Sequence, residues 1–308
     1  MKKIYVILNP CAKKFRLHKS SINNYTRLKY SGLKIFYTKN MEELRETINI
    51  IKSEKPDYIG IGGGDGTIHV VMTELINGLK PDNIPPVLIL KEGTMNNIAA
   101  TIHLKGTGDK ILARMIAAIE RNSSVQVITR DTIKINDKYC FIFGLGLITN
   151  FLNLVYSGGE KGLIRNLYVG VKTFIEAIFN TSEGKVFTKM NFIIEADGGK
   201  IAINPVTGIL SGTVEHIGMG FTPLSQAAVF PGRFQTIILG MEPRQVLLNI
   251  NKLRRGDKIY NPGYADFHSS FLTLTYNGEF EYTMDGDIYT ADRELVVKSG
   301  PAISLVKV

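Results

Sequence analysis

Residues 58–67 read Tyr-Ile-Gly-Ile-Gly-Gly-Gly-Asp-Gly-Thr, an apolar run that ends in a cluster of glycines. The apolar start predicts a buried strand at residues 58–61, and the residues after the cluster predict a helix over 67–77. Glycines at four of the five positions 62–66 let the backbone turn sharply and approach a ligand closely. Amide groups at a helix start favour an anion, most simply a phosphate. The plain alternative is a turn in which Asp65 has only a structural role.

Strands and helices alternate on both sides of this turn. The other expected strands are residues 4–8, 33–37 and 87–90, and the other expected helices are residues 42–52, one from about Met95, and one around 111–119. Such alternation is typical of a parallel sheet covered by helices on both faces. We therefore expect an α/β nucleotide-binding domain over residues 1–122.

The pattern changes after residue 122. Strands are expected at residues 125–135 and 139–147, joined by a turn at Asn136-Asp137, with one helix at 163–178 and a short one near 243–253. Turn signals occur at 197–199, 277–278 and 285–286, and Asn277-Gly278 between two apolar runs is a strong hairpin signal. We expect residues 123–308 to form a mostly antiparallel β-sandwich or flattened barrel, with the last residues returning to the first domain.

The composition limits the classes of protein to consider. The chain has 308 residues, 44% of them hydrophobic, and two cysteines, which cannot build a disulfide framework. We expect Cys11 and Cys140 to be free thiols in a reducing compartment. No targeting segment is visible, and no apolar run reaches the roughly 18 residues of a membrane-spanning helix. These features predict a soluble, cytoplasmic protein.

The net charge of +9 is unevenly distributed. Residues 1–41 contain ten Lys or Arg and no Asp or Glu, so the rest of the chain has a net charge of about −1 (9 minus 10). A positive field of this kind attracts nucleic acid, anionic lipid headgroups or a phosphorylated small molecule, or it simply keeps the surface solvated. Aromatic residues are interspersed here, but no recognisable nucleic-acid module accompanies them, so we expect no nucleic-acid partner.

A second loop follows the next predicted strand, where residues 90–97 read Leu-Lys-Glu-Gly-Thr-Met-Asn-Asn. Thr94 is a candidate N-cap, with Asn97 three residues later. In a parallel sheet both loops lie at the carboxyl edge, where ligands bind in open α/β folds. Asp65 would repel a phosphate there unless it served Mg²⁺ or took a proton from an acceptor hydroxyl. His69 either contacts a phosphate or has a capping or surface role.

The motifs at 62–67 and 93–97 together resemble the catalytic domain of diacylglycerol kinases. Within this family the resemblance is greatest to the soluble bacterial lipid kinases, and sphingosine and ceramide kinases are more distantly related. Asn9-Pro10, Thr38 and Met-Asp-Gly-Asp at 284–287 are similar to further motifs of this family, and residues 159–168 are similar more loosely. The resemblance implies two domains with ATP in the cleft between them, a lipid acceptor and bound Mg²⁺.

The resemblance also implies roles for individual residues. Those expected to contact ATP are Asn9, Pro10, Lys13, Thr38, Gly63, Gly64, Asp65, Gly66, Thr67, His69, Gly93, Thr94 and Asn96. Asp287 would accept the proton of the lipid hydroxyl. Asp65 would organise Mg²⁺ or the hydroxyl, although in the sphingosine kinases the equivalent residue is the proposed base.

Several positions depart from the family pattern. Lys91-Glu92 replace Pro-Leu, Asn97 replaces an aspartate, and Asp287 replaces a glutamate. Residues 230–234, Phe-Pro-Gly-Arg-Phe, stand where bacterial members hold a structural Mg²⁺ with Asp-Asp-Gly-Leu. Because Arg233 would repel a cation, we expect no metal there.

The sequence thus predicts an ATP- and Mg²⁺-dependent kinase that phosphorylates the hydroxyl of a diacylglycerol-like lipid, with the basic N-terminal region drawing the enzyme to anionic membranes. One alternative is a weak or inactive homologue that binds nucleotide or lipid. Another is an NAD kinase, which shares the first motif but has a second Asn-Glu motif that this chain lacks. The acceptor lipid and the oligomeric state stay open.

Overall fold

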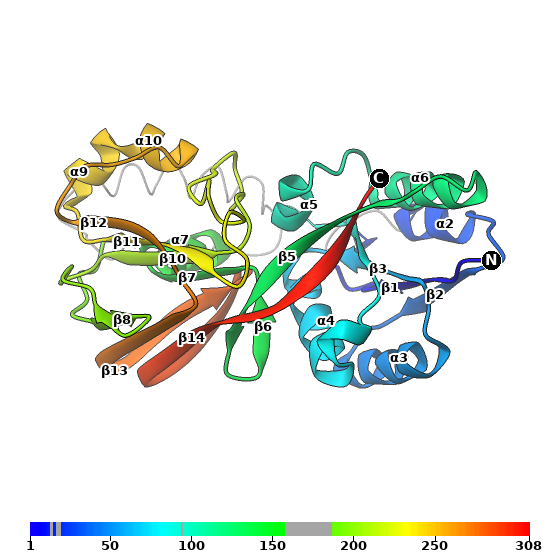
Figure 1. The fold of residues 1–308 in the computed structure, drawn as a ribbon, viewed down its shortest axis with the longest axis horizontal. Coiled ribbons are helices and arrows are strands. Elements are labelled where there is room, and N and C mark those ends of the chain that lie inside the picture. Colours follow the sequence, from blue (N-terminus) through cyan, green and yellow to red (C-terminus); the bar gives the residue numbers. More distant parts are fainter. Residues whose placement is uncertain (13–14, 17–19, 94, 158–186) are drawn as a thin grey trace. The chain divides into compact units, whose positions relative to one another are not determined.

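The computed structural model describes residues 1–12, 15–16, 20–93, 95–157 and 187–308 (Figure 1). Two compact units make up the chain. The first comprises Met1–Thr132, Asp137–Tyr139 and Pro301–Val308, and the second comprises Ile133–Asn136 and Cys140–Gly300. The helix predicted at 163–178 lies outside the described residues, as do Lys13, Thr94 and residues 159–168.

The first unit is built on a parallel sheet. Its strands are β1 (Ile4–Leu8), β2 (Leu33–Tyr37), β3 (Tyr58–Gly63) and β4 (Val87–Lys91). They lie in the order β4-β3-β1-β2. The end of β14 (Asp287–Lys307) adds a further parallel strand beside β4, with Leu305 opposite Val87. All five side chains of β1 are buried, because helices cover both faces of the sheet. The predicted α/β fold of this part is confirmed.

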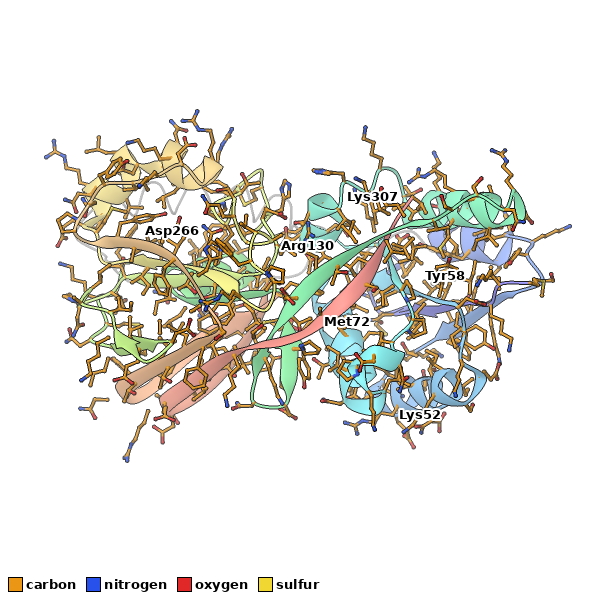
Figure 2. All side chains as sticks on the ribbon, viewed as in Figure 1. Lys52, Tyr58, Met72, Arg130, Asp266 and Lys307 are labelled. Atoms are coloured by element: carbon orange, nitrogen blue, oxygen red, sulfur yellow. The ribbon has the colours of Figure 1, made fainter. Side chains whose placement is uncertain are left out.

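Helices flank this sheet on two sides. They are α2 (Ser20–Thr26), α3 (Met41–Glu54), α4 (Asp65–Gly78), α5 (Asn97–Thr101) and α6 (Gly108–Glu120), with a 3₁₀ turn at Pro81–Asn83. Figure 1 shows α3 and α4 on one side of the sheet and α2 and α6 on the other. On α3 and α4, Lys52 extends outward whereas Met72 is buried (Figure 2). The helices therefore follow the apolar periodicity of the sequence.

The second unit is mostly antiparallel. Its strands are β5 (Gln126–Ile135), which begins in the first unit, β7 (Ile142–Gly146), β8 (Ile193–Ala196), β9 (Gly199–Lys200), β10 (Gly208–Gly212), β11 (Phe234–Leu239), β12 (Tyr264–Ser269), β13 (Phe271–Met284) and β14. The main order is β12-β11-β10-β7-β13-β14, and every one of these pairings is antiparallel. Its described helices are α7 (Leu147–Ser157), α9 (Pro243–Leu248) and α10 (Ile250–Arg255). The predicted antiparallel character is confirmed.

The hairpin predicted at Asn277-Gly278 is wrong. Strand β13 runs through this position, and only its register with β14 shifts, between Thr275 and Glu279. The strand continues because β14 pairs with it on both sides of the shift, with Thr275 opposite Glu294 and Glu279 opposite Asp292. Beside the shift, Tyr276 stacks on Phe192 with ring centroids 4.8 Å apart. The turn between β13 and β14 lies instead at Asp285-Gly286, where both residues have positive φ angles of 49° and 98°.

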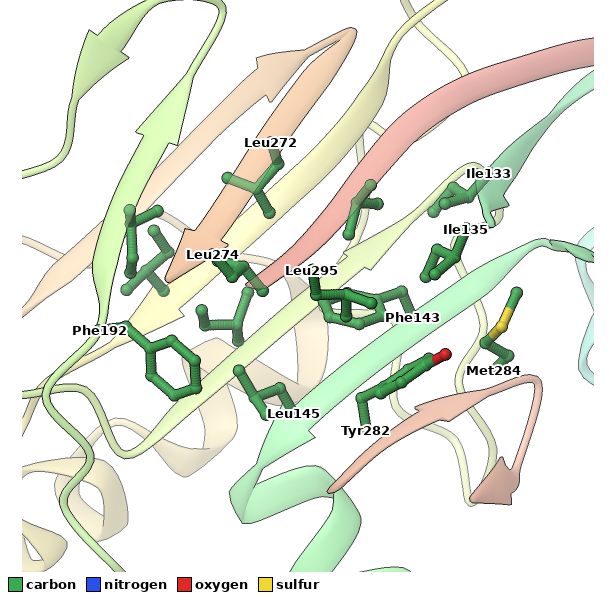
Figure 3. Packing of buried hydrophobic residues seen from close by; sticks show 14 of the residues in the cluster. Ile133, Ile135, Phe143, Leu145, Phe192, Leu272, Leu274, Tyr282, Met284 and Leu295 are labelled. Carbon is green, nitrogen blue, oxygen red and sulfur yellow. The ribbon is translucent and has the colours of Figure 1, made fainter. Parts of the chain in front are cut away.

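A hydrophobic cluster forms the core of the second unit (Figure 3). Strand β7 contributes Phe143 and Leu145, and Tyr282 of β13 lies 6.0 Å from Phe143 between ring centroids. Leu295 of β14 and Ile133 of β5 pack in the same cluster. Side chains from strands that are distant in sequence thus pack together in one core.

In the described parts of the chain no helix combines the length and the apolar character needed to cross a membrane. Both cysteines are free, Cys11 at the surface and Cys140 in the interior.

Candidate active site

The carboxyl ends of the parallel strands bring the predicted nucleotide loops to one sheet edge. The amide of Asn9, after β1, donates to the carbonyl of Gly62 at 3.0 Å, and the amide of Glu92, after β4, donates to the carbonyl of Gly63 at 3.2 Å. Thr38, after β2, donates its amide to the carbonyl of Leu8 at 2.9 Å. The loops that follow four neighbouring strands therefore meet, as ligand sites in open α/β sheets require.

The glycine cluster forms an abrupt strand-to-helix turn. Strand β3 ends at Gly63 and α4 begins at Asp65, so Gly64 alone lies between them. A Cβ atom on Gly93 would lie 2.5 Å from the Cα of Gly64, and one on Gly63 would lie 2.4 Å from the Cβ of Thr67. The two loops thus pack backbone against backbone, and a side chain at position 93 would force them apart.

The start of α4 carries no side-chain cap. Its N-cap is Gly64, which has no side chain, and Thr67 is already the third residue of the helix. The hydroxyl of Thr67 instead accepts a hydrogen bond from Asn9 Nδ2 at 3.1 Å, while Asn9 Oδ1 accepts from the amide of Cys11 at 2.9 Å. The first amides of a helix have no intrahelical partner, so this uncapped end favours an anion.

Asp65 is directed at the start of a different helix. Its carboxylate accepts the amide of Asn97, at the start of α5, with distances of 3.0 and 3.3 Å. Burial is the main cause that raises the pKa of Asp65 to about 6, and the amides of Asn97, Asn96 and Ile98 lower it in part. Asp65 therefore links the turn after β3 to the turn after β4.

The second loop begins its helix later than the sequence predicted. The N-cap of α5 is Asn96, which has a left-handed backbone with φ 51° and ψ 47°, rather than Thr94. The Asn96 side chain binds Gly93 twice, through the amide at 3.0 Å and the carbonyl at 2.8 Å. Asn97 Oδ1 is buried and has no hydrogen-bond partner among the described residues.

His69 is buried against the chain at Tyr139. The side chain is 1% exposed, and Nδ1 lies 2.8 Å from the carbonyl oxygen of Tyr139. Burial lowers the pKa of His69 to about 4, so the imidazole is neutral at physiological pH. The surface role considered for His69 is therefore wrong, because the ring does not meet solvent, whereas its contact with a phosphate stays a prediction.

His69 belongs to a row of polar side chains on one face of α4. One turn later, Thr73 Oγ1 accepts the amide of Tyr139 at 3.0 Å, and after another turn Asn77 Nδ2 donates to the carbonyl of Asp137 at 2.9 Å. The spacing of four residues places all three on the same helix face. They hold the turn that leads into β6 (Lys138–Cys140).

The departure at Glu92 has a structural partner that sequence reasoning missed. Tyr25 Oη donates to Glu92 Oε1 at 2.5 Å in the interior, and a Cβ on Gly108 would lie 2.1 Å from the same hydroxyl. The residues come from three distant parts of the chain, so no local pattern could have indicated the contact. Glu92 can therefore be buried where the family has an apolar residue, because its carboxylate accepts the hydrogen bond from Tyr25.

In the second unit, Asp285 has a role in chain geometry. Its carboxylate accepts the amides of Phe141, at 3.1 Å, and Ile142, at 2.9 Å, and its own amide donates to the carbonyl of Ile142. These bonds replace ladder pairing and divide the predicted strand 139–147 into β6 and β7. Asp285 therefore fixes the turn on which Asp287 is carried.

Asp287 is the first residue of β14 and is half-buried. Burial raises the pKa of its carboxyl group, and burial followed by the charge of Asp287 raises the pKa of Tyr289. The carbonyl of neighbouring Gly286 accepts Tyr156 Oη of α7 at 2.9 Å. Asp287 is thus a partly desolvated carboxyl on a tightly held turn.

At the family's structural Mg²⁺ position, Arg233 supplies a positive charge. Its Nη1 lies 3.0 Å from Asp197 Oδ2, and Asp197 also accepts the amide and the hydroxyl of Ser270. The guanidinium therefore neutralises the carboxylate there.

A cluster of metal-binding side chains is not found among the described residues. Nowhere in those ranges do three His, Cys, Asp or Glu side chains gather closely enough to hold a metal ion. At the glycine turn, both carboxylate oxygens of Asp65 already accept the amide of Asn97, so this carboxylate is directed at a helix start.

The part of the chain that carries the glycine turn and the Gly93 loop matches a known family. Residues 3–128 match the diacylglycerol kinase catalytic domain. This region holds each loop of the sheet edge, and the resemblance predicted from the motifs is confirmed. The chain is 29% identical over 239 residues to "Putative lipid kinase SAR0780" of Staphylococcus aureus (strain MRSA252), an alignment that covers 75% of this chain and 71% of that protein.

Solved structures support the same fold beyond the catalytic domain. A putative diacylglycerol kinase from Bacillus anthracis str. Sterne superposes with a TM-score of 0.73 at 18% identity, over 100% of this chain and 96% of that one. A diacylglycerol kinase structure from the same organism superposes with a TM-score of 0.66 at 17% identity, over 100% and 97% of the two chains. The fold of both units is therefore that of these proteins.

Proposed function

We propose that this protein is an ATP- and Mg²⁺-dependent lipid kinase that transfers the γ-phosphate to the hydroxyl of a diacylglycerol-like lipid. The single observation that carries the proposal is the uncapped start of α4, which lies against the Gly93 loop. Both belong to the region that matches the diacylglycerol kinase catalytic domain. Backbone amides and the helix dipole at this point suit a triphosphate.

The first unit supplies the nucleotide contacts in this proposal. Gly64, Gly66 and Thr67 present the start of α4 to the phosphates, and Asn9 and Thr38 flank them at the same sheet edge. Pro10, Gly63, Gly93 and Asn96 shape these loops. Lys13 and Thr94 stay predictions from the resemblance. Mg²⁺ would enter with the triphosphate, since no three acidic or other metal-binding side chains gather among the described residues.

Asp287 is the proposed proton acceptor. The hydroxyl proton of the lipid passes to the Asp287 carboxylate as the hydroxyl oxygen forms a bond to the γ-phosphorus. The bond between the γ-phosphorus and the bridging oxygen of ADP breaks, and ADP leaves with that electron pair. A carboxyl group whose pKa is raised by burial is a stronger base than an exposed one, which suits this role.

Asp65 is proposed as a positioning residue. Its carboxylate accepts the amides at the start of α5, so its removal would loosen the Gly93 loop against the glycine turn. This contact explains how a carboxylate can lie beside a phosphate site, because its charge is directed to the α5 amides.

The direct test measures labelled phosphate transferred from ATP to diacylglycerol in mixed detergent micelles. We expect product with the wild type, and a loss of roughly a hundredfold or more for Asp287→Asn. Asp82→Asn removes an exposed carboxylate in the same protein and should retain full activity. If the wild type gives no more product than Asp287→Asn and Asp65→Ala, the proposal is wrong.

A second candidate function is that of a binding protein without catalytic activity. Asn97 favours it, because a neutral amide whose Oδ1 is buried and unpartnered among the described residues stands where the family has an ionisable aspartate. Calorimetry that detects ATP binding, together with no turnover on a panel of lipid acceptors, would support it. Formation of NADP⁺ in a coupled assay would instead indicate an NAD kinase.

A further inference from the structure

The most exposed large apolar side chains of the second unit lie on one short segment, residues 243–260. Tyr260 is 83% exposed and Leu248 is 77% exposed. Apart from Met1, every other large apolar side chain in the described ranges is at most 58% exposed. Figure 1 shows α9, α10 and the chain that follows them side by side at one end of this unit.

The same segment is strongly basic. It contains five Lys or Arg and one Asp, a net charge of +4 (5 minus 1). Arg255 pairs with Asp257 at 2.7 Å, whereas the other four basic residues have no ion pair in the described structure: Arg244, Lys252, Arg254 and Lys258. Long nitrogen-tipped side chains project outward from α9 and α10 (Figure 2). Positive charge and exposed apolar groups therefore share one surface.

This surface is held in place by its own buried residues. Val246, Leu253 and Ile259 face the interior and anchor α9, α10 and the following chain. The carbonyl of Arg254 accepts the amide of Thr222 at 2.7 Å, and the carbonyl of Gly256 accepts Ser225 Oγ at 3.0 Å. Since the anchors already satisfy the core, Leu248 and Tyr260 are free to serve an external partner.

The chemistry of the segment is that of a membrane interface. Lys and Arg are attracted to anionic headgroups, and a tyrosine near the surface places its ring at headgroup depth. Lys258 Nζ lies 5.2 Å from the centroid of the Tyr260 ring, so charge and ring are presented together. A nucleic acid would use the charges and the tyrosine, but it offers nothing to an aliphatic side chain such as Leu248.

We propose that Arg244, Leu248, Lys252, Arg254, Lys258 and Tyr260 form a docking surface for anionic membranes, here named the α9–α10 surface. The inference rests on the proposed function, because the acceptor of a lipid kinase resides in a bilayer. It assigns membrane contact to a part of the chain distinct from the basic N-terminal region.

The test is co-sedimentation of the full chain with vesicles of phosphatidylcholine, with and without phosphatidylglycerol, in the absence of ATP. We expect binding only with the anionic lipid, weakening as salt is raised. Two double variants, Leu248→Asn with Tyr260→Asn and Lys252→Glu with Arg254→Glu, should each weaken binding roughly tenfold or more. Thermal unfolding checks that both remain folded.

The matched control is Ile193→Asn with Lys200→Glu, which removes an exposed apolar side chain and reverses a basic one on the β8–β9 hairpin of the same unit. It should bind like the wild type. The inference is overturned if the wild type does not bind the anionic vesicles or if both test variants bind them like the wild type. It is also overturned if the control loses as much vesicle binding as the test variants. Binding to single-stranded nucleic acid without binding to vesicles also overturns it.

Detergent micelles without charged lipid separate this inference from the proposed function. Both α9–α10 variants should phosphorylate micellar diacylglycerol at the wild-type rate. A wild type that binds vesicles but phosphorylates no lipid would refute the kinase proposal and leave the docking surface in place.

Discussion

Asp65 lies in the first turn of α4, yet its carboxylate accepts hydrogen bonds from the start of α5. Two helix starts favour its negative charge, whereas burial opposes the charge more strongly and raises the pKa to about 6. At the level of single residues, the motif aspartate is therefore part of the loop architecture. Asp285 acts in the same way in the second unit, by binding the amides of Phe141 and Ile142.

The raised pKa of Asp65 predicts how stability depends on pH. Because the folded state holds the proton up to about pH 6 and the unfolded state only to about 3.8, the contribution is complete below pH 3.8 and is lost as pH rises through 6. Compared with Asp65→Asn, which does not titrate, the wild type should lose up to about 3 kcal/mol of unfolding free energy between pH 4 and 7. Urea unfolding at several pH values measures this, and parallel pH profiles for the two proteins would contradict it.

The raised pKa of Asp287 predicts an acid limb in the pH–rate profile. As a proton acceptor it must be ionised, so kcat/KM should rise with pH through an apparent pKa above the usual aspartate value. Asp65 also titrates, near pH 6, so the profile is measured in the Asp65→Asn background as well. A limb that persists in Asp65→Asn and is absent from the residual activity of Asp287→Asn assigns it to Asp287. An unchanged limb in Asp287→Asn would exclude the role.

At the scale of elements, the site depends on how closely the loops after β3 and β4 approach each other. Gly93 lies against Gly64 with no room for a Cβ atom, and Asn96 holds Gly93 by two hydrogen bonds. Helix α4 is also held further along, where Thr73 binds Tyr139 of β6 and Asn77 binds Asp137 just before it. The geometry offered to a phosphate is thus determined by contacts between elements.

Gly93→Ala should separate these two loops. Its Cβ would lie 2.5 Å from the Cα of Gly64, so the backbone must move, and we expect ATP affinity measured by calorimetry to fall at least tenfold, about 1.4 kcal/mol. Gly199→Ala is the control, because its Cβ would meet only the carbonyl oxygen of Ala196 at 3.5 Å. Equal ATP affinity in the wild type and Gly93→Ala would refute this account of the site.

At the scale of the whole molecule, residues from the end of the chain complete the first unit. Pro301–Val308 belong to it, and Ile303, Leu305 and Val306 are buried there. The fold also brings acidic partners to the basic N-terminal region: Lys2 pairs with Asp57 at 2.7 Å and Lys34 with Glu54 at 2.9 Å. The positive field expected from the first 41 residues is therefore partly neutralised.

Leu305→Ala tests the contribution of the returning strand. The side chain is fully buried beside β4, so the substitution should lower the free energy of unfolding by about 2–5 kcal/mol and speed hydrogen exchange in β4. Leu248→Ala, at a position that is 77% exposed, should change stability by less than about 0.5 kcal/mol. A mild effect of Leu305→Ala, with slow exchange in β4, would show that the first unit is stable without this strand.

Local signals in the sequence determined most of the first unit. Buried strands such as Ile4–Leu8 and the glycine turn after β3 depend on apolar runs and on glycine's conformational freedom, which act over a few residues. The two motifs also carried the resemblance to diacylglycerol kinases. The tertiary structure decided what local patterns cannot contain: the continuation of β13 through Asn277-Gly278, the direction of the Asp65 carboxylate and the burial of His69. Each depends on a partner outside the local pattern, strand β14, Asn97 or Tyr139, and such contacts exist only once the chain has folded.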